Sequence, residues 1–221
     1  MEKIYKPADF ADLTNGNTYF LFGNYNLLYF HKQEQKYVLA QIDPLSENYT
    51  ASDYFDLPES APFELINGKL IFMASPRNKH QKLSFELTLL LGNYIKKHKL
   101  GELMVAPSDV HFDDKNVVQP DLYFVCIERA EILESDPTKE APDMTVEILS
   151  DGTKADDYKR KMQLYAKFGV LEYWIIDIKQ QKVEVYENQK QEMVLVQKAF
   201  AGGKISSKVI KGFVLELNDI F

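Results

Sequence analysis

Apolar residues recur at helical spacing in one long stretch, residues 79–97. Side chains three and four positions apart lie on the same face of an α-helix, so this repeat predicts an amphipathic helix. The members of the apolar stripe are Leu83, Leu87, Leu90, Leu91 and Tyr94. We therefore predict a long helix here, preceded by a stop at Ser75-Pro76.

A second amphipathic helix is predicted over residues 155–168. Its apolar stripe consists of Tyr158, Met162 and Tyr165. Thr153 is placed to cap the first turn, and Asp156 and Asp157 suit the positive end of the helix dipole. Gly169 suits the position just after the last turn, where a left-handed backbone often ends a helix.

The other apolar runs are short and predict strands. Asn67-Gly68 lies between two of them, which predicts a type I′ turn that pairs residues 63–66 with 69–73. The runs between the helices are "ELMVAPSDVHF", "VVQPDLYFVCI" and "MTVEIL", and those after the second helix are "EYWIIDI", "KVEVYEN" and "MVLVQKAF". Pro120 has no N–H for a sheet ladder, so we expect it at a strand entry or a sheet edge.

The order of these elements predicts a mixed α/β domain over residues 49–221. A hairpin, a helix, three strands, a helix, a strand and a hairpin follow one another, so we expect one central β-sheet flanked by helices. Residues 1–48 instead contain the runs "NTYFLF", "NLLYFH" and "KYVLAQI", which turn-like residues separate. These runs predict a small β-rich N-terminal extension in the form of a meander.

The composition narrows the class of protein. An apolar content of 45% and a charged content of 27% are ordinary for a soluble globular protein. No apolar run approaches the ~18 residues of a membrane span, and no secretory apolar region follows Met1. The single cysteine, Cys126, cannot form an intramolecular disulfide. We therefore expect a cytoplasmic protein with no membrane segment.

The charge is acidic overall but unevenly distributed. A net charge of −7 argues against a simple nonspecific nucleic-acid binder, because phosphate contacts require lysine and arginine. Between residues 79 and 99, however, five lysines face only Glu86. This segment is either a basic binding face or an ordinary solvated helix face.

Two acids interrupt apolar strands that follow each other in the chain, Asp121 and Glu147. If the strands are neighbours, the two carboxylates can converge on one point. A hard divalent cation such as Mg²⁺ prefers carboxylate oxygens, and it could polarise a phosphodiester there. The alternative is a pair of structural acids satisfied by backbone amides or a lysine.

Lys161 on the second predicted helix adds a cation to this arrangement. Asp157, Lys161 and Tyr165 are four residues apart, so they share one stripe beside the apolar face. A fixed cation stabilises the charge that develops on a phosphate during cleavage. The alternative is a lysine that faces solvent on a strongly charged helix.

Longer motifs carry a family resemblance. The segments "QPDLYFV" and "APDMTVEILSDGTKADDYKRKMQLYAKFGVLEYWIIDI" resemble the Uma-two-type restriction endonuclease family, a branch of the PD-(D/E)XK nuclease superfamily. The stretch "YTASDYFDLPESAPFELINGKLIFMASPRNKHQ" resembles the opening of that family, and "VIKGFVLELNDIF" its ending. The resemblance covers residues 49–221 and implies a restriction-endonuclease-like α/β core.

The resemblance also implies roles for particular residues. Asp121 matches the aspartate of the first superfamily motif, and Glu147 matches the acid of the second. The superfamily lysine two residues after that acid is replaced by Leu149, and Lys161 matches the displaced basic position of this branch. Thr153, Asp157 and Tyr165 also match the helix motif, the first two as capping and orienting groups.

Two further residues are weaker candidates. Glu64 matches an acid in the opening hairpin and could add a carboxylate to the metal site, or it could pair across the hairpin with a lysine. His80 could approach a phosphate or orient a water, or it could simply be exposed. Trp174, in an apolar strand, is expected in the core.

These observations predict a Mg²⁺-dependent endonuclease that cleaves DNA, with Mn²⁺ as a substitute metal. Asp121 and Glu147 would hold the metal with help from Glu64, and Lys161 would stabilise the developing charge. The alternatives are a nuclease-fold module that binds nucleic acid or a protein without cutting, and a purely structural α/β oligomer. Nucleases that cut duplexes often dimerise, so a homodimer or higher homo-oligomer is expected.

Overall fold

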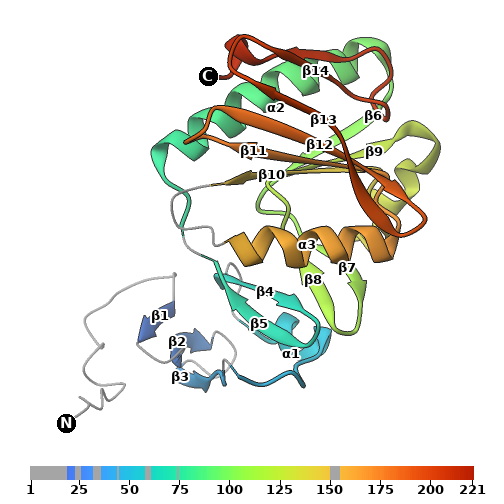
Figure 1. The fold of residues 1–221 in the computed structure, drawn as a ribbon. Helices are drawn as coiled ribbons and strands as arrows, with labels where there is room; N and C mark the ends of the chain where they lie inside the picture. The colour runs from blue at the N-terminus through green and yellow to red at the C-terminus, as the bar shows by residue number, and fades with distance from the viewer. Residues whose placement is uncertain are drawn as a thin grey trace.

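The fold is seen in a computed structural model (Figure 1). The structure describes residues 19–22, 26–31, 36–43, 45–57, 61–73, 75–149 and 155–221. Thr153, the predicted helix cap, lies outside these residues. Among the helices that the described residues form, none has the length and apolar character needed to span a membrane.

The N-terminal strands form a three-stranded antiparallel meander. Its strands are β1 (Tyr19–Phe22), β2 (Asn26–His31) and β3 (Lys36–Gln41), in the order β1-β2-β3. The meander predicted for this segment is therefore confirmed. The division of the chain at residues 48 and 49 stays a prediction.

A six-stranded mixed sheet forms the centre of the rest of the chain, in the order β13-β12-β11-β10-β9-β6. Its strands are β6 (Gly101–Val105), β9 (Leu122–Cys126), β10 (Met144–Leu149), β11 (Glu172–Asp177), β12 (Lys182–Gln189) and β13 (Glu192–Phe200). Only the β10–β11 pair in this sheet is parallel. Helix α3 follows β10 and connects it to β11, as a crossover between parallel strands requires.

Helices α2 (Asn78–His98) and α3 (Ala155–Phe168) cover opposite faces of this sheet (Figure 1). Successive strand residues point to opposite faces, so Val146 and Trp174 pack towards α2. Tyr123 and Tyr173 pack towards α3. Both predicted helices are thus confirmed, and Trp174 is fully buried in the core as expected.

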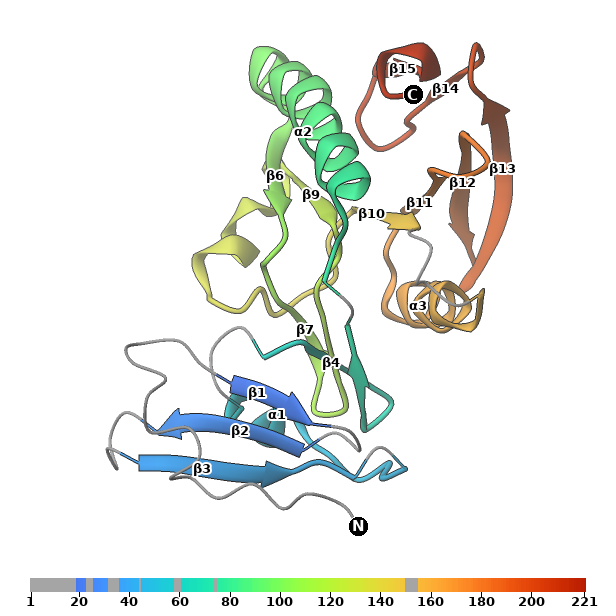
Figure 2. The same cartoon turned by 90° about the vertical axis from the view of Figure 1, so that its left-hand side faces the viewer.

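A separate four-stranded sheet, in the order β5-β4-β8-β7, continues from one end of the six-stranded sheet (Figure 2). Its strands are β4 (Phe63–Ile66), β5 (Lys69–Phe72), β7 (Val110–Asp113) and β8 (Asn116–Val118). The β4–β5 turn has positive φ at Asn67 (51°) and Gly68 (76°), which confirms the predicted hairpin.

The predicted central mixed sheet flanked by helices is confirmed, but two of the runs predicted as strands are not single strands. The runs "ELMVAPSDVHF" and "VVQPDLYFVCI" each divide into two strands, one in each sheet. Pro107 and Pro120 lie in the two breaks, where their missing N–H groups cost no ladder hydrogen bond. The chain therefore passes twice between the sheets, and Asp121 lies at one of these passages.

The remaining elements close the two ends of the domain. They are α1 (Ala51–Phe55), the 3-10 helices η2 (Ile127–Glu134) and η3 (Leu217–Asp219), and the strand pair β14 (Lys204–Ser206) and β15 (Val214–Glu216). Thr50 caps α1 by accepting a hydrogen bond from the Asp53 N–H. The buried Glu172 carboxylate of β11 accepts hydrogen bonds from the Ser207 hydroxyl and the Lys208 N–H, which tie the C-terminal segment to this strand.

Candidate functional site

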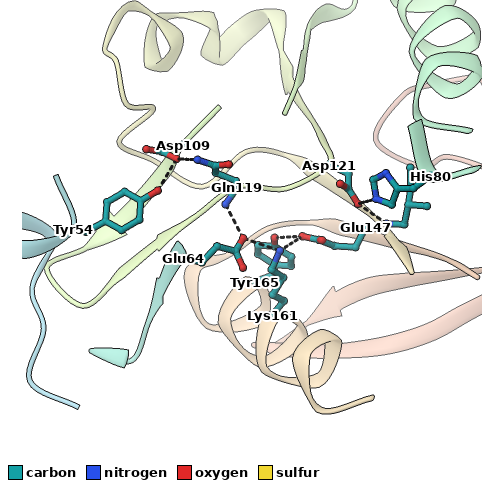
Figure 3. Close-up of polar contacts among 10 residues, drawn as sticks. Tyr54, Glu64, His80, Asp109, Gln119, Asp121, Glu147, Lys161 and Tyr165 are labelled. Atoms are coloured by element: carbon teal, nitrogen blue, oxygen red, sulfur yellow. Dashed lines mark hydrogen bonds and ion pairs between the residues drawn. The ribbon is translucent and has the colours of Figure 1, made fainter. Parts of the chain in front are cut away.

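The predicted site residues meet where the two sheets join (Figure 3). Glu64 comes from β4, Asp121 from the break before β9, and Glu147 from β10. Lys161 comes from α3 and His80 from the first turn of α2. Five segments that are distant in sequence thus supply one polar cluster.

Lys161 lies between two carboxylates. Its Nζ is 2.8 Å from Oε1 of Glu147 and 2.8 Å from Oε1 of Glu64. The side chain is buried, with a relative exposure of 9%, so the interpretation of Lys161 as a solvent-facing lysine is wrong. Burying an ammonium costs free energy unless a negative charge is close to it. Here the carboxylates of Glu147 and Glu64 together offset the loss of solvent around Lys161.

Tyr165, one turn after Lys161, completes the contacts of Glu147. Its hydroxyl donates a 2.7 Å hydrogen bond to Glu147 Oε1, the same oxygen that Lys161 contacts. Tyr165 is fully buried. The helix motif included this tyrosine, but the sequence did not predict its contact with the acid.

Asp121 is held at the backbone of the strand that carries Glu147. Its Oδ2 accepts a 2.7 Å hydrogen bond from the N–H of Ile148 and lies 3.2 Å from Nε2 of His80. The prediction that His80 is exposed is wrong, because its relative exposure is 8%. The amphipathic pattern of α2 did not include this histidine, whose burial comes from its contact with Asp121.

Glu64 also has a different partner from the one the hairpin suggested. Ile71, not a lysine, lies opposite Glu64 on β5, and Lys69 pairs with Glu47 instead. The proposed cross-strand lysine pair is therefore wrong. Besides Lys161, Oε1 of Glu64 accepts a 2.8 Å hydrogen bond from the backbone N–H of Gln119.

Burial dominates the electrostatics of the cluster. Burial raises the pKa of Glu147 to about 7, because the attraction of Lys161 only partly offsets the loss of solvent and the repulsion of Asp121 and Glu64. Burial opposes the charge of Lys161, but the two carboxylates outweigh it and hold the lysine pKa above its usual value. Glu147 is thus an acid that titrates near neutral pH.

The histidine beside Asp121 is also perturbed. Burial lowers the pKa of His80, but the hydrogen bond and negative charge of Asp121 outweigh this effect and raise it overall. The ring nitrogen that faces away from Asp121, Nδ1, is buried and has no partner among the described residues. Within the described residues, the contact of Nε2 with Oδ2 of Asp121 therefore orients the ring.

The donor chemistry of the site fits a hard divalent cation. Mg²⁺ often binds proteins through only one or two carboxylates and keeps several waters. The described residues make their contacts with Oδ2 of Asp121 and with Oε1 of Glu147. Within the described part of the chain, no three His, Cys, Asp or Glu residues form a ready-made metal cluster. The side chain of Asp157, a weaker candidate, is outside the described residues.

Three residues connected to this cluster were not predicted. The side chain of Gln119 donates to Oδ1 of Asp109, and the hydroxyl of Tyr54 donates to the same oxygen (Figure 3). The only sequence signal was the position of Gln119 directly before Pro120-Asp121. Tyr54 lies in the stretch that resembles the opening of the family, and Asp109 in a predicted strand run, but neither residue was given a role.

Comparisons with known proteins agree with the architecture. A crystal structure of a putative nuclease belonging to DUF820 from Anabaena variabilis matches with a TM-score of 0.66. The match covers 78% of this chain and 97% of that chain at 24% sequence identity, and it shows a shared fold. The fold, with its mixed sheet between two helices, is restriction-endonuclease-like, as predicted.

The family follows from the sequence match. The family model described as "Uma2: Putative restriction endonuclease" matches residues 51–218. The chain therefore belongs to the Uma2 family, as the motifs predicted. A comparison with curated proteins found no match.

Proposed function

We propose that this protein is a divalent-metal-dependent endonuclease that hydrolyses DNA phosphodiester bonds. The observation that carries the proposal is the buried ammonium of Lys161, which lies 2.8 Å from Glu147. The residue after Glu147 on β10, Ile148, donates its backbone N–H to Asp121, so both acids are held at one strand. Membership of a family described as restriction endonucleases supports a nuclease, and it suggests DNA as the substrate. A cytoplasmic location and a homodimer or higher homo-oligomer stay predictions.

In this proposal Asp121 and Glu147 hold Mg²⁺, or Mn²⁺ in its place. The metal would supply Lewis-acid chemistry to the phosphodiester and its attacking water. Glu64 stays a predicted third ligand, and its contribution would fall on Oε2, because Oε1 already accepts from Lys161 and Gln119.

The chain's own residues then have separate tasks. Lys161 places a fixed positive charge where a phosphate gains negative charge, and it needs no reorganisation during the reaction. Tyr165 fixes the Glu147 carboxylate, and His80 together with the Ile148 N–H fixes that of Asp121. Glu147 must lose its proton before it can bind a cation, so the site should work best above pH 7.

The experiment is a cleavage assay on plasmid and oligonucleotide DNA over a range of Mg²⁺ and Mn²⁺ concentrations. Asp121→Asn and Glu147→Gln should abolish metal-dependent cleavage while they retain the circular dichroism spectrum of the wild type. Asp219→Asn and Glu192→Gln make the same changes at exposed positions and should leave cleavage unchanged.

The same assay separates the alternative function. A nuclease-fold module that binds without cutting would show salt-sensitive DNA binding, measured by fluorescence anisotropy in Ca²⁺, but no metal-dependent product. A structural oligomer would show neither. Wild-type protein that yields no product with any nucleic acid in either metal would overturn the proposal.

A further inference from the structure

A chain of hydrogen bonds runs from the candidate site to α1 (Figure 3). It starts at Glu64, passes through Gln119 and Asp109, and ends at the hydroxyl of Tyr54. Glu64 and Gln119 are 55 residues apart in the sequence, Gln119 and Asp109 are 10 apart, and Asp109 and Tyr54 are 55 apart. These hydrogen bonds therefore join segments that the tertiary fold brings together.

Gln119 is the central member because it uses both its main chain and its side chain. Its backbone N–H donates to Glu64 Oε1 at 2.8 Å, and its side-chain Nε2 donates to Asp109 Oδ1 at 2.7 Å. Gln119 lies in the passage between the sheets, two residues before Asp121. A shift of this residue would therefore move both Glu64 and the segment that carries Asp121.

The far end of the chain is anchored in a packed region. Tyr54 is buried on α1 in a core with Phe63 and Leu65 of β4, and its hydroxyl donates to Asp109 Oδ1 at 3.0 Å. Asp109 accepts from both Tyr54 and Gln119 on one oxygen, which fixes the position of that oxygen. Gln119 is thus held by an element that takes no direct part in the candidate site.

The near end of the chain reaches the lysine. Oε1 of Glu64 accepts from the Gln119 N–H and from the Lys161 ammonium, so the place of this oxygen is set by both donors. If the Gln119 contact loosens, Glu64 can rotate and Lys161 loses one of its two carboxylate partners. The ammonium would then be free to move relative to Glu147.

We propose that Gln119 is a positioning residue of the nuclease site, which acts through Glu64 to fix the ammonium of Lys161. This inference rests on the proposed function, since it assigns Gln119 a part in the same reaction. Among the described residues, Gln119 hydrogen-bonds to Glu64 and Asp109 but not to Lys161, Asp121 or Glu147, so it is a positioning residue and not a catalytic one. A purely structural tie between β8 and α1 would instead affect stability alone.

The test replaces Gln119 with leucine, which removes the side-chain bond to Asp109 and retains the backbone N–H. Gln197→Leu is a matched control, because the Gln197 side chain also bridges two segments, through the N–H and C=O of Ser206 on β14. Tyr54→Phe is a second variant that removes only the hydroxyl at the far end of the chain. All are made in the full-length protein.

The first measurement does not depend on cleavage. The hydrogen-exchange rate of the Lys161 ammonium is measured by ¹⁵N NMR, with the signal assigned by its absence in Lys161→Met. We expect severalfold faster exchange in Gln119→Leu, a smaller change in Tyr54→Phe, and no change in Gln197→Leu. Equal exchange in Gln119→Leu and the wild type would overturn the inference, whether or not the protein cleaves DNA.

The second measurement is the kinetics of cleavage. We expect kcat to fall on the order of 10-fold in Gln119→Leu, with KM for DNA unchanged. This is the size of effect expected for a residue that orients a functional group without contacting the substrate. An effect on melting temperature without a change in kcat would show a structural tie and would overturn the inference. Faster ammonium exchange in a protein that never cleaves DNA would support the link to Lys161 and count against the proposed nuclease.

Discussion

The substitution Lys161→Met removes a cation that lies between the buried carboxylate of Glu64 and the carboxylate of Glu147, whose side chain is 12% exposed. The methionine fills much of the same volume, so the main change is electrostatic. Glu147 and Glu64 lose their shared partner, and Glu147 keeps only the hydroxyl of Tyr165 on its Oε1. Breaking a buried ion pair in this way costs about 3–5 kcal/mol of unfolding free energy, because an unpaired charge remains inside the protein.

The size of this loss should depend on pH. Burial has already raised the pKa of Glu147 to about 7, and without Lys161 it must rise further. A folded pKa above the unfolded value means stability that is present at low pH and lost as the pH rises through the folded pKa. Around pH 6 Glu147 is largely protonated with or without Lys161, so it adds little to the difference between variant and wild type.

Above pH 7 the two proteins diverge. The wild type ionises Glu147 beside Lys161, whereas the variant must either keep the proton or bury an unpaired charge. Each pH unit adds about 1.4 kcal/mol to the difference, until the pKa of the variant is reached. Between pH 7 and pH 9 the destabilisation should therefore grow by up to about 2.7 kcal/mol.

Urea unfolding at pH 6, 7, 8 and 9, followed by circular dichroism, measures this difference. Lys167→Met is the control, since Lys167 is an exposed lysine of the same helix whose contact with Asp113 is 3.8 Å long. Such a surface pair is worth roughly 0–1 kcal/mol, and its loss should not vary over this pH range. A destabilisation by Lys161→Met that is equal at pH 6 and pH 9 would refute the argument that burial controls Glu147.

Three further predictions concern the same network and its support. Tyr165→Phe removes the 2.7 Å hydrogen bond to Glu147 and should weaken Mn²⁺ binding about 10–100-fold, measured by electron paramagnetic resonance; unchanged affinity would contradict a role for the tyrosine. Mg²⁺ affinity should rise between pH 6 and pH 8, because the pKa of Glu147 is raised to about 7 and the acid must lose its proton to bind the cation. Calorimetry in two buffers should detect proton release on binding below pH 7, and the absence of proton release would exclude Glu147 as a ligand. Glu172→Leu should lower the unfolding free energy by about 1.5–3 kcal/mol or more, because Trp174 and Ser207 lose a charged acceptor; an unchanged thermal midpoint would show that this carboxylate is dispensable.

Local signals in the sequence were sufficient for most of the elements. The Asn67-Gly68 pair identified its hairpin because only a few residues adopt the two positive φ angles of that turn. The second helix has the predicted bounds, and Gly169 ends it with a φ of 86°. These features depend on neighbours within a few positions, which is the range over which periodicity and turn chemistry operate.

The pairing of strands is not local, and the second, four-stranded sheet was not predicted. Pro120 correctly indicated a break in pairing, but nothing in the run showed that its two halves enter different sheets. The choice of partner strand depends on packing between segments far apart in the chain. The same limit applies to His80, whose burial depends on Asp121, 41 residues away.

The acids of the site could be predicted because charge in an apolar strand is unusual, and a backbone amide or a lysine was one predicted alternative for the partners of Asp121 and Glu147, but the partner of Glu64 was not predicted. For Glu64 the two alternatives were a metal ligand and a pair with a lysine of its own hairpin, whereas the lysine that it contacts is Lys161 from α3. Gln119 is uncharged, and Asp109 is an acid in a loop. Neither residue belongs to a periodic pattern. Their contacts arise only from the junction between the sheets.

The absence of a lysine at position 149 has a structural explanation. Residues two apart in a strand point to the same face, so Leu149 and Glu147 share the face of β10 that α3 covers. Leu149 packs there against the apolar cluster that includes Leu164 and Tyr165 of α3. A cation can therefore reach Glu147 either along the strand or from the helix above it, and in this chain it comes from the helix. The charge therefore lies beside the acid, although Lys161 follows Glu147 by 14 residues in the sequence.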